Sequence, residues 1–248
     1  MSNLEEDILV SKSLSAGGKH HRAYVGPPDQ YDFMGATQFR LLTALGLTEE
    51  HRLLDIGCGS LRAGRLLIQY LMPDRYVGVD PNGWLWRDAI KSEIGEDIIA
   101  IKRPLLIESG DFALSQIGSQ TVDYAVAQSI YSHAGASMMA VSISAIARIL
   151  KPSGQFLFTI ITPENPNSER MMSGVDHEGW LYPGCLVYSE SEVFNAIAKT
   201  GMICQRLAWY HPRQTWFRAI YDPKLQISQE MASQLGTGRP LFDERFQN

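Results

Sequence analysis

The chain has few cysteines and no long apolar run. Its 3 cysteines, Cys58, Cys185 and Cys204, lie far apart and form no Cys-x-x-Cys pair. This spacing predicts neither a zinc site nor a disulfide framework, so no metal is expected. No apolar stretch reaches membrane-spanning length, and residues 1–10 lack the basic flank and apolar core of a secretory signal. We therefore expect a cytoplasmic protein without a membrane partner.

An excess of positive charge is also missing. The 22 Lys+Arg against 27 Asp+Glu give a formal net charge of -5, which predicts no general attraction to nucleic acid. Nucleic acid is therefore a disfavoured partner, although composition leaves a local basic patch open. A hydrophobic content of 45% over 248 residues is enough for one large core without disulfides. Homo-oligomerisation is left open by the composition.

Strand and helix signals alternate along the chain. Short β-rich runs occur at 52–56, 75–79, 105–108, 122–128 and 155–161, and segments with helical apolar spacing separate them. Two later runs, 203–209 and 214–221, predict an antiparallel pair that closes the sheet. The pattern predicts an α/β fold: a Rossmann-like, seven-stranded, mainly parallel sheet with helices on both faces and an antiparallel final strand.

Two helices have clear sequence signals. Residues 137–150 carry apolar side chains at three-to-four spacing, and the following Lys-Pro-Ser-Gly at 151–154 predicts a helix stop and a turn. The second helix begins at Ser189, which forms a capping-box pattern with Glu192, and it ends before Gly201.

The longer punctuated stretches suggest how the chain is organised. Residues 1–46 are expected to form an N-terminal cap and helix, and residues 226–248 a C-terminal tail. The core is expected to span 47–225, with a lid-like insertion at 162–188 that is longer than a simple connection needs.

A glycine-rich turn follows the first predicted strand. Residues 53–60 read Leu-Leu-Asp-Ile-Gly-Cys-Gly-Ser, and Gly57 and Gly59 allow a ligand to approach the backbone at the carboxyl end of this strand. A dinucleotide fingerprint would require Gly or Ala where Arg62 stands, and the Gly-Lys-Ser/Thr of a phosphate loop is absent. Asp55 is placed to bind a cationic ammonium or to order its surroundings. This suits an amino-acid-bearing cofactor better than a pyrophosphate.

This turn and the next strand carry a family resemblance. The pattern Asp55-x-Gly57-x-Gly59, followed by Asp80 at the end of the next strand, resembles the class I S-adenosylmethionine-dependent methyltransferases. The resemblance extends over most of 52–161 and implies S-adenosylmethionine as the cofactor. It implies that Asp80 binds both ribose hydroxyls and that the other three residues line the cofactor.

Two later segments extend the resemblance. Residues 108–112 read Glu-Ser-Gly-Asp-Phe and resemble the family's loop after the third strand. This implies that Asp111 accepts from the adenine amino group and that the Phe112 amide contacts the ring. The next predicted strand resembles the family's fourth, which implies that Gln128 and Ser129 line the methionine end.

Three residues have open roles. Arg62 replaces the usual third glycine of the loop, and it either pairs with the cofactor's carboxylate or is an ordinary solvated arginine. Tyr131 and His133 follow the fourth strand and are the candidate catalytic residues, since either can position or deprotonate an acceptor. Histidine suits this with a reference pKa of about 6.5. Both side chains could equally serve hydrogen-bonded packing.

The methyl acceptor is harder to read. Residues 128–131 read Gln-Ser-Ile-Tyr where amino-methylating nucleic-acid enzymes place Asp/Asn-Pro-Pro-aromatic, and no acid lies in 125–133 to hold magnesium. We therefore expect O- or N-methylation of a small organic molecule. A methyltransferase for a peptide, protein or RNA, a catalytically silent S-adenosylmethionine-binding protein, and a nicotinamide oxidoreductase disfavoured by Arg62 are the alternatives. Residues 17–38 and 162–188 are expected to close over the cofactor pocket.

Overall fold

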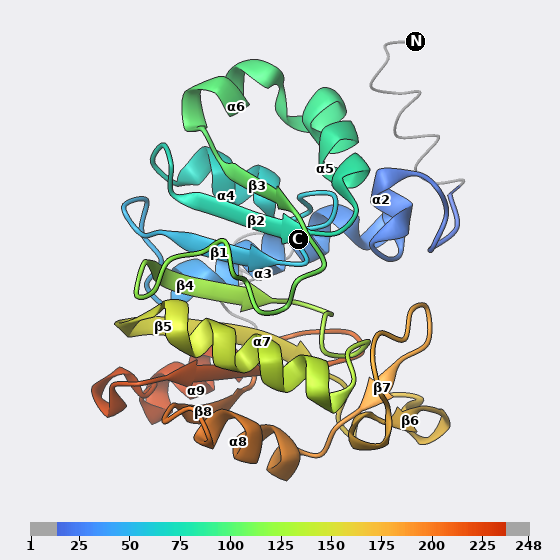
Figure 1. The fold of residues 1–248 in the computed structure, drawn as a ribbon, viewed down its shortest axis with the longest axis vertical. Helices are drawn as coiled ribbons and strands as arrows, with labels where there is room; N and C mark the ends of the chain where they lie inside the picture. Colours follow the sequence, from blue (N-terminus) through green and yellow to red (C-terminus); the bar gives the residue numbers. More distant parts are fainter. Residues whose placement is uncertain (1–13, 237–248) are drawn as a thin grey trace, which may run out of the picture. The chain divides into compact units, whose positions relative to one another are not determined.

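The computed structural model describes residues 14–236, in which seven strands form one sheet in the order β3-β2-β1-β4-β5-β9-β8 (Figure 1). The strands are β1 (Leu53–Ile56), β2 (Tyr76–Asp80), β3 (Leu105–Glu108), β4 (Val122–Ala127), β5 (Leu150–Ile160), β8 (Ile203–Leu207) and β9 (Thr215–Ile220). Neighbours β1, β4 and β5 pair in parallel, as do β2 and β3, whereas β9 runs antiparallel to β5 and β8. The predicted Rossmann-like, mainly parallel sheet with an antiparallel final strand is confirmed.

The chain divides into two compact units. Unit 1 combines the described part of Met1–Glu50 with Gly57–Ser109, and unit 2 combines His51–Ile56 with the described part of Gly110–Asn248. Strands β2 and β3 belong to unit 1, and the other strands belong to unit 2. Each unit has its own helices.

Unit 1 surrounds its two strands with short helices. These are α2 (His21–Tyr24), α3 (Tyr31–Ala44), α4 (Gly64–Tyr70), α5 (Gly83–Ala89) and α6 (Glu96–Lys102). Helix α4 packs against α3 and β2, and α2 packs against α5. A π-helical turn, Ile90–Ile94, joins α5 to α6, and the Gly95 N–H donates to the Ile90 carbonyl at 2.8 Å. The sequence pattern gives no signal for this wider turn.

Unit 2 contains a core rich in phenylalanine. Its helices are α7 (Ala136–Ile149), α8 (Glu190–Ala198) and α9 (Gln229–Gly236), and β6 (Met172–Ser173) pairs with β7 (Leu186–Val187) in a separate small sheet. Helix α7 packs against β5 and α8 (Figure 1). The Phe158 ring stacks on Phe156 at 4.7 Å and on Phe217 at 5.7 Å, and all three are fully buried. Such burial is typical of strands covered on both faces.

The two helices with sequence signals form as expected. Helix α7 lies within one residue of the predicted 137–150 at each end. At α8 the capping box is confirmed, because the Ser189 N–H donates to Glu192 Oε2 at 2.7 Å and the Glu192 N–H donates to Ser189 Oγ at 3.3 Å. Gly201 follows with φ of 81°, a conformation that favours glycine.

The expected turn at 151–154 is wrong. Strand β5 already begins at Leu150, and residues 151–154 form an irregular bulge within it. Val122 pairs with Leu150 and Tyr124 pairs with Gln155, so the β5 side of the ladder carries the extra residues. A Cβ at Gly154 would lie 2.7 Å from Leu150 Cγ, which explains why the bulge closes on a glycine.

Candidate functional site

The glycine turn of unit 1 lies against the end of β2. Gly57 and Cys58 both donate their backbone N–H groups to the Val79 carbonyl, at 2.7 and 3.2 Å. Gly57 and Gly59 have φ of 70° and 51°, which glycine adopts freely. The Gly59 N–H donates to Asp80 Oδ2 at 3.1 Å. The structure therefore brings the predicted turn and the predicted ribose acid together.

Asp80 ends β2 with a carboxylate that is largely covered. The residue is 8% exposed, and its Oδ1 accepts from the backbone N–H and the side-chain amide of Asn82, at 2.8 and 3.1 Å. Burial raises the pKa of Asp80, and the hydrogen bonds from Asn82 and Gly59 oppose this rise. A carboxylate offers about four acceptor positions, so three bonds leave capacity for a ligand hydroxyl.

The N-terminal segment packs directly on this turn. A Cβ at Gly59 would lie 2.8 Å from Val25 Cγ1, so Val25 takes part of the space that the sequence suggested for a ligand. The Tyr31 hydroxyl donates to the Ser60 carbonyl at 2.8 Å. Arg62 Nη1 donates to the Val25 carbonyl at 3.1 Å, a contact that sequence reasoning missed.

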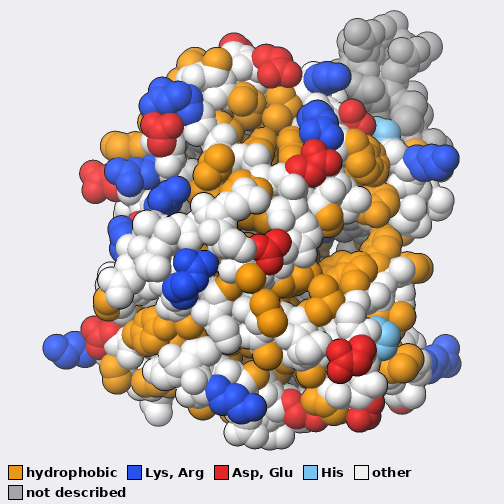
Figure 2. Space-filling view, in the orientation of Figure 1, with side chains coloured by type: hydrophobic (Ala, Val, Ile, Leu, Met, Phe, Trp, Pro, Cys, Tyr) orange, Lys and Arg blue, Asp and Glu red, His pale blue; other side chains and the backbone are white. Residues whose placement is uncertain are grey.

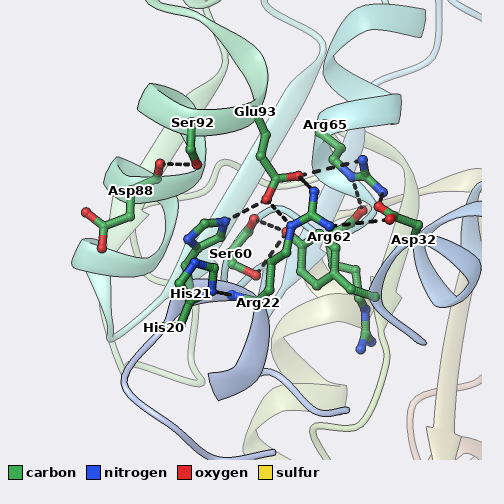
Figure 3. A network of polar contacts seen from close by, with 11 residues as sticks. His20, His21, Arg22, Asp32, Ser60, Arg62, Arg65, Asp88, Ser92 and Glu93 are labelled. Atoms are coloured by element: carbon green, nitrogen blue, oxygen red, sulfur yellow. Dashed lines mark hydrogen bonds and ion pairs between the residues drawn. The ribbon is translucent and has the colours of Figure 1, made fainter. Parts of the chain in front are cut away.

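Glu93, in the π-helical turn, is the centre of a charged network in unit 1 (Figure 3). Its carboxylate bonds to His21 Nε2 at 2.6 Å and to Arg22 Nε and Nη2 at 2.8 and 2.9 Å, and Arg65 Nη1 lies 3.6 Å away. Asp32 pairs with both arginines. Burial favours a raised pKa for Glu93, but the bonds from His21 and Arg22 outweigh it and lower the pKa. The network ties α2 and α3 to α4 and the π-helical turn.

Two predicted cofactor acids lie in unit 2. Asp55 occupies β1 and is 5% exposed. Asp111 is exposed and caps a turn, since Oδ1 accepts from the Ala113 N–H at 2.8 Å and Oδ2 accepts from Ser115. Bonds from Ser115 and Ala113 lower the pKa of Asp111, which keeps its carboxylate ionised at neutral pH.

Gln128 follows β4 with an amide that the protein leaves unpaired. The residue is 7% exposed, and neither Oε1 nor Nε2 has a hydrogen-bond partner among residues 14–236. A buried polar group without a partner costs on the order of 1–3 kcal/mol. The amide of Gln128 is therefore available to a ligand or a water molecule.

A neutral network that the sequence did not reveal holds the residues after Gln128. Ser129 has φ of 62° and donates its N–H to Thr159 Oγ1 at 2.8 Å. Thr159 Oγ1 in turn donates to Gln214 Oε1 at 2.6 Å. Gln214 Nε2 donates to Ser129 Oγ at 3.1 Å and to Ser132 Oγ at 3.4 Å. Uncharged groups thus fix a backbone conformation that serine rarely adopts.

Tyr131 lies in the core of unit 2. Its hydroxyl pairs with Ser142 Oγ of α7 at 2.8 Å, and its ring stands edge-on to Phe156 and Phe158. The residue is fully buried, and burial raises the pKa of its hydroxyl. This placement favours the packing role over the deprotonation of an acceptor.

His133 has one ring nitrogen fixed by the backbone. Nδ1 lies 2.7 Å from the Gly184 carbonyl and 3.1 Å from the Leu181 carbonyl. Because both partners are acceptors, Nδ1 carries the hydrogen, and the neutral ring leaves Nε2 as an acceptor. Burial is the main cause that lowers the pKa of His133, and Arg213 lowers it further. The imidazole is therefore neutral at pH 7 and can take up a proton.

Two aromatic rings lie next to His133, and a third lies next to one of them. Its ring centroid lies 5.5 Å from Trp180 and 5.2 Å from Tyr182, and Phe112 lies 6.0 Å from Trp180. We name these four residues the ring cluster. Trp180 is 46% exposed and Tyr182 41% exposed. Strand β7 lies in the same segment, 162–188, as Trp180 and Tyr182. Figure 2, in the orientation of Figure 1, shows hydrophobic side chains around the position of this strand.

Backbone hydrogen bonds tie residues 162–188 to the turn after β4. The Leu181 N–H donates to the His133 carbonyl at 2.7 Å, and the Leu186 N–H donates to the Ser132 carbonyl at 2.8 Å. The exposed rings therefore stand on a backbone held at two points.

Comparison with known protein families gives a match for the central part of the chain. Residues 54–158 match the family model of a methyltransferase domain. Residues 54–158 therefore form a methyltransferase domain, as the sequence resemblance implied. Its cofactor is S-adenosylmethionine, as the sequence resemblance implied. No curated protein is similar enough in sequence to count as a relative.

This methyltransferase is similar to solved structures of the same fold. Magnesium protoporphyrin IX methyltransferase from Synechocystis PCC 6803, with bound S-adenosylmethionine, is 16% identical with a TM-score of 0.55, over 78% of this chain and 83% of that one. A methyltransferase in complex with the Haloferax volcanii Trm112 activator is 19% identical with a TM-score of 0.54, over 78% and 96%. An O-methyltransferase family protein from Burkholderia thailandensis is 15% identical with a TM-score of 0.53, over 77% and 59%. At these identities the likeness shows the fold alone.

The described residues lack two features, a membrane-spanning helix and a metal-binding group of side chains. Between residues 14 and 236, the methyltransferase has no helix that is both long and apolar enough to cross a membrane. Over the same residues, no three His, Cys, Asp or Glu side chains group so as to hold a metal ion.

Proposed function

We propose that this methyltransferase transfers a methyl group to an oxygen or nitrogen of a small organic molecule. The observation that carries the proposal is the neutral His133, whose Nε2 is an acceptor beside the exposed rings of Trp180 and Tyr182. A neutral base among rings suits a compact acceptor with a hydroxyl or amine proton. Charges of both signs are mixed on the face in Figure 2, and the net charge is -5, which disfavours RNA.

The cofactor supplies an activated methyl group, and the chain's residues have to hold it. We assign the ribose hydroxyls to Asp80, which fits because its carboxylate retains acceptor capacity. We assign the methionine end to Gln128, which fits because its buried amide has no partner among the described residues. The remaining assignments from the family resemblance are Asp55, Gly57 and Gly59 at the turn, and Asp111 with the Phe112 amide at the adenine. Arg62 departs from the family pattern, and we assign it to the cofactor's carboxylate on its charge alone, although its Nη1 already donates to the Val25 carbonyl.

Few of the chain's own side chains have to take part in the chemical step. It has to orient the acceptor, exclude water and, for a hydroxyl or an ammonium, take up one proton. We assign the proton to His133 Nε2. Tyr131 is left out of this role because its hydroxyl is buried against Ser142.

We assign the closing of the site to residues 17–38 and 162–188. The first segment contacts the glycine turn, and the second is bonded to the turn after β4. Hydrogen exchange with and without S-adenosylhomocysteine should reveal protection in one or both segments. Protection restricted to the surroundings of Gly57, Asp80 and Asp111 would contradict a closing role.

The proposed function is tested in two steps. Calorimetry against S-adenosylmethionine, S-adenosylhomocysteine and NAD should give binding of the first two only. Incubation with radiolabelled methyl donor and separate pools of small molecules, proteins and RNA should then label the small molecules. Label confined to protein or RNA would contradict the acceptor class, and binding without transfer to any pool would indicate a catalytically silent protein.

A further inference from the structure

We infer that the acceptor is a planar aromatic molecule that carries the hydroxyl to be methylated and, in addition, an anionic group such as a carboxylate. The inference rests on the proposed function and deepens it. The residues that carry it are the ring cluster, the Nε2 atom of His133 and the guanidinium of Arg213, all of which belong to unit 2.

The ring cluster offers a prearranged aromatic surface. Trp180 and Tyr182 stay 46% and 41% exposed although their segment is bonded to the turn after β4. Because the backbone under the rings is already held, less conformational freedom is lost when a ligand stacks on them. Offset or edge-to-face contacts with a further aromatic ring are worth about 1 kcal/mol each beyond the area they bury. The surface therefore favours a planar aromatic acceptor over an aliphatic one.

His133 selects a proton donor on that ring. Its Nδ1 is committed to the Gly184 and Leu181 carbonyls, so the free nitrogen can only accept. A phenolic hydroxyl donates to such an atom. In the transfer, the hydroxyl oxygen forms the bond to the methyl carbon, and the methyl–sulfur bond breaks with its electron pair left on sulfur. The hydroxyl proton goes to His133 Nε2.

Arg213 supplies a positive charge without a counter-ion. It is exposed and directly precedes Gln214, which is bonded to Ser129 and Ser132. Its charge acts on both His133 and Cys185, and among residues 14–236 its side chain forms no ion pair. The Gln214–Ser132 hydrogen bond joins the chain neighbours of Arg213 and His133 and so brings their two backbone positions near each other. An unpaired guanidinium there complements an anionic group and binds a carboxylate with two parallel bonds.

The positive charge of Arg213 favours an anionic aromatic acceptor over a cationic one. Exposed rings alone would also suit a cationic acceptor through cation–π contacts. Arg213 repels such a ligand and attracts an anionic one. We therefore expect the acceptor to carry a negative charge.

Binding of defined probes tests the charge. The full chain, saturated with S-adenosylhomocysteine, is titrated by calorimetry with 4-hydroxybenzoate, phenol, tyramine and cyclohexanecarboxylate. We expect 4-hydroxybenzoate to bind about tenfold more tightly than the other three. Arg213→Gln should remove its advantage over phenol, whereas Arg206→Gln, an exposed arginine of β8 in the same unit, should leave that advantage unchanged.

Turnover tests the base. His133→Asn keeps an N–H near the position of Nδ1, which preserves the bonds to the two carbonyls, and removes the Nε2 acceptor. With a hydroxybenzoate acceptor we expect kcat to fall about 100-fold while KM changes little. Raising the pH until the acceptor hydroxyl is ionised should restore much of the loss, which a purely structural defect would not allow.

The outcomes separate the inference from the proposed function. Equal binding of phenol, tyramine and hydroxybenzoate, or an Arg213→Gln variant without effect, would overturn the inference. Methylation of an aliphatic or cationic small molecule would also overturn it while the proposed function stands. Labelling of protein or RNA alone would overturn both.

Discussion

The two units stabilise their chain turns by different physical means. In unit 1, the helices around the glycine turn are held by ion pairs, because Glu93 contacts two arginines as well as His21. In unit 2, the turn after β4 is held by neutral groups, because Gln214 bonds to serine and threonine hydroxyls. The stability of the glycine turn should therefore respond to pH and salt, whereas the turn after β4 should respond to the shape and hydrogen-bond geometry of its neutral side chains.

Substitutions in the charged network and in the neutral network should lower stability by different amounts. Removal of one ion from a buried cluster leaves the opposite charges uncompensated, which is strongly destabilising. Removal of a neutral amide leaves hydroxyls unpaired, which costs less for each group and is not screened by salt. Substitutions in each network therefore test the contrast directly.

The largest effect is expected from Glu93→Gln in unit 1. The variant keeps the shape of the side chain but removes the anion that His21 contacts and leaves the two arginines with only the exposed Asp32, so the free energy of unfolding should fall by about 3 kcal/mol. Urea unfolding at pH 7 measures this. Glu50→Gln, at an exposed glutamate of the same unit, is the control and should change stability by less than about 0.5 kcal/mol. A comparable loss in both variants would contradict a special role for Glu93.

The Glu93 effect should also depend on pH. Since the folded-state pKa of Glu93 is lowered, its stabilisation is fully present above the ordinary glutamate pKa of about 4.3 and is lost as the pH falls through the folded value. The stability gap between the parent chain and Glu93→Gln should narrow below about pH 4. A constant gap from pH 7 to pH 3 would show that charge is not the cause.

The next effect concerns the cofactor. Asp80→Ala should weaken S-adenosylhomocysteine binding by about 2 kcal/mol, roughly 30-fold in Kd, because the ribose hydroxyls lose a charged acceptor. Asp80→Asn should lose less, since an amide oxygen can still accept from Gly59. Calorimetry measures the Kd, and Asp88→Ala, at an exposed acid of α5, is the control. Unchanged affinity in a folded Asp80→Ala variant would remove Asp80 from the site.

Gln214→Leu tests the neutral network of unit 2. Three hydroxyls would lose a partner, and we expect a loss of stability of about 1 to 2 kcal/mol. The loss should stay the same between low salt and 1 M salt, whereas that of Glu93→Gln should shrink. Gln226→Leu, at an exposed glutamine, is the matched control. A salt-dependent loss at Gln214 would break the contrast between the units.

The smallest effect is expected at the cap of α8. Ser189→Ala removes the acceptor for the Glu192 N–H and should cost about 1 kcal/mol of stability. The Kd for S-adenosylhomocysteine should not change, because the cap belongs to neither network. Ser119→Ala, at an exposed serine of the same unit, is the control. A changed Kd in Ser189→Ala would indicate that α8 contributes to the cofactor site.

Local sequence patterns were sufficient for the fold and for part of the site. Apolar runs and turn residues predicted the strands because strand and helix periodicity is a property of neighbouring residues. The positions of Gly57, Gly59 and Asp80 at strand ends were predicted in the same way, whereas their roles toward the cofactor came from the family resemblance and stay predictions. The bulge at 151–154 was not predicted, because it depends on how β5 pairs with β4.

Local sequence patterns predicted the α/β fold, because strand ends and glycine turns are encoded within a few residues of one another, and the methyltransferase activity followed from the resemblance of those segments to a known family. Only the tertiary structure decided which side chains meet across long distances along the chain. Arg22 and Glu93 are 71 residues apart, and Ser129 and Gln214 are 85 apart. The tertiary structure also gives different environments to Tyr131 and His133, which are two residues apart. Tyr131 is buried in the core, and His133 lies next to exposed rings. Such contacts follow from the packing of whole elements, which no local pattern contains.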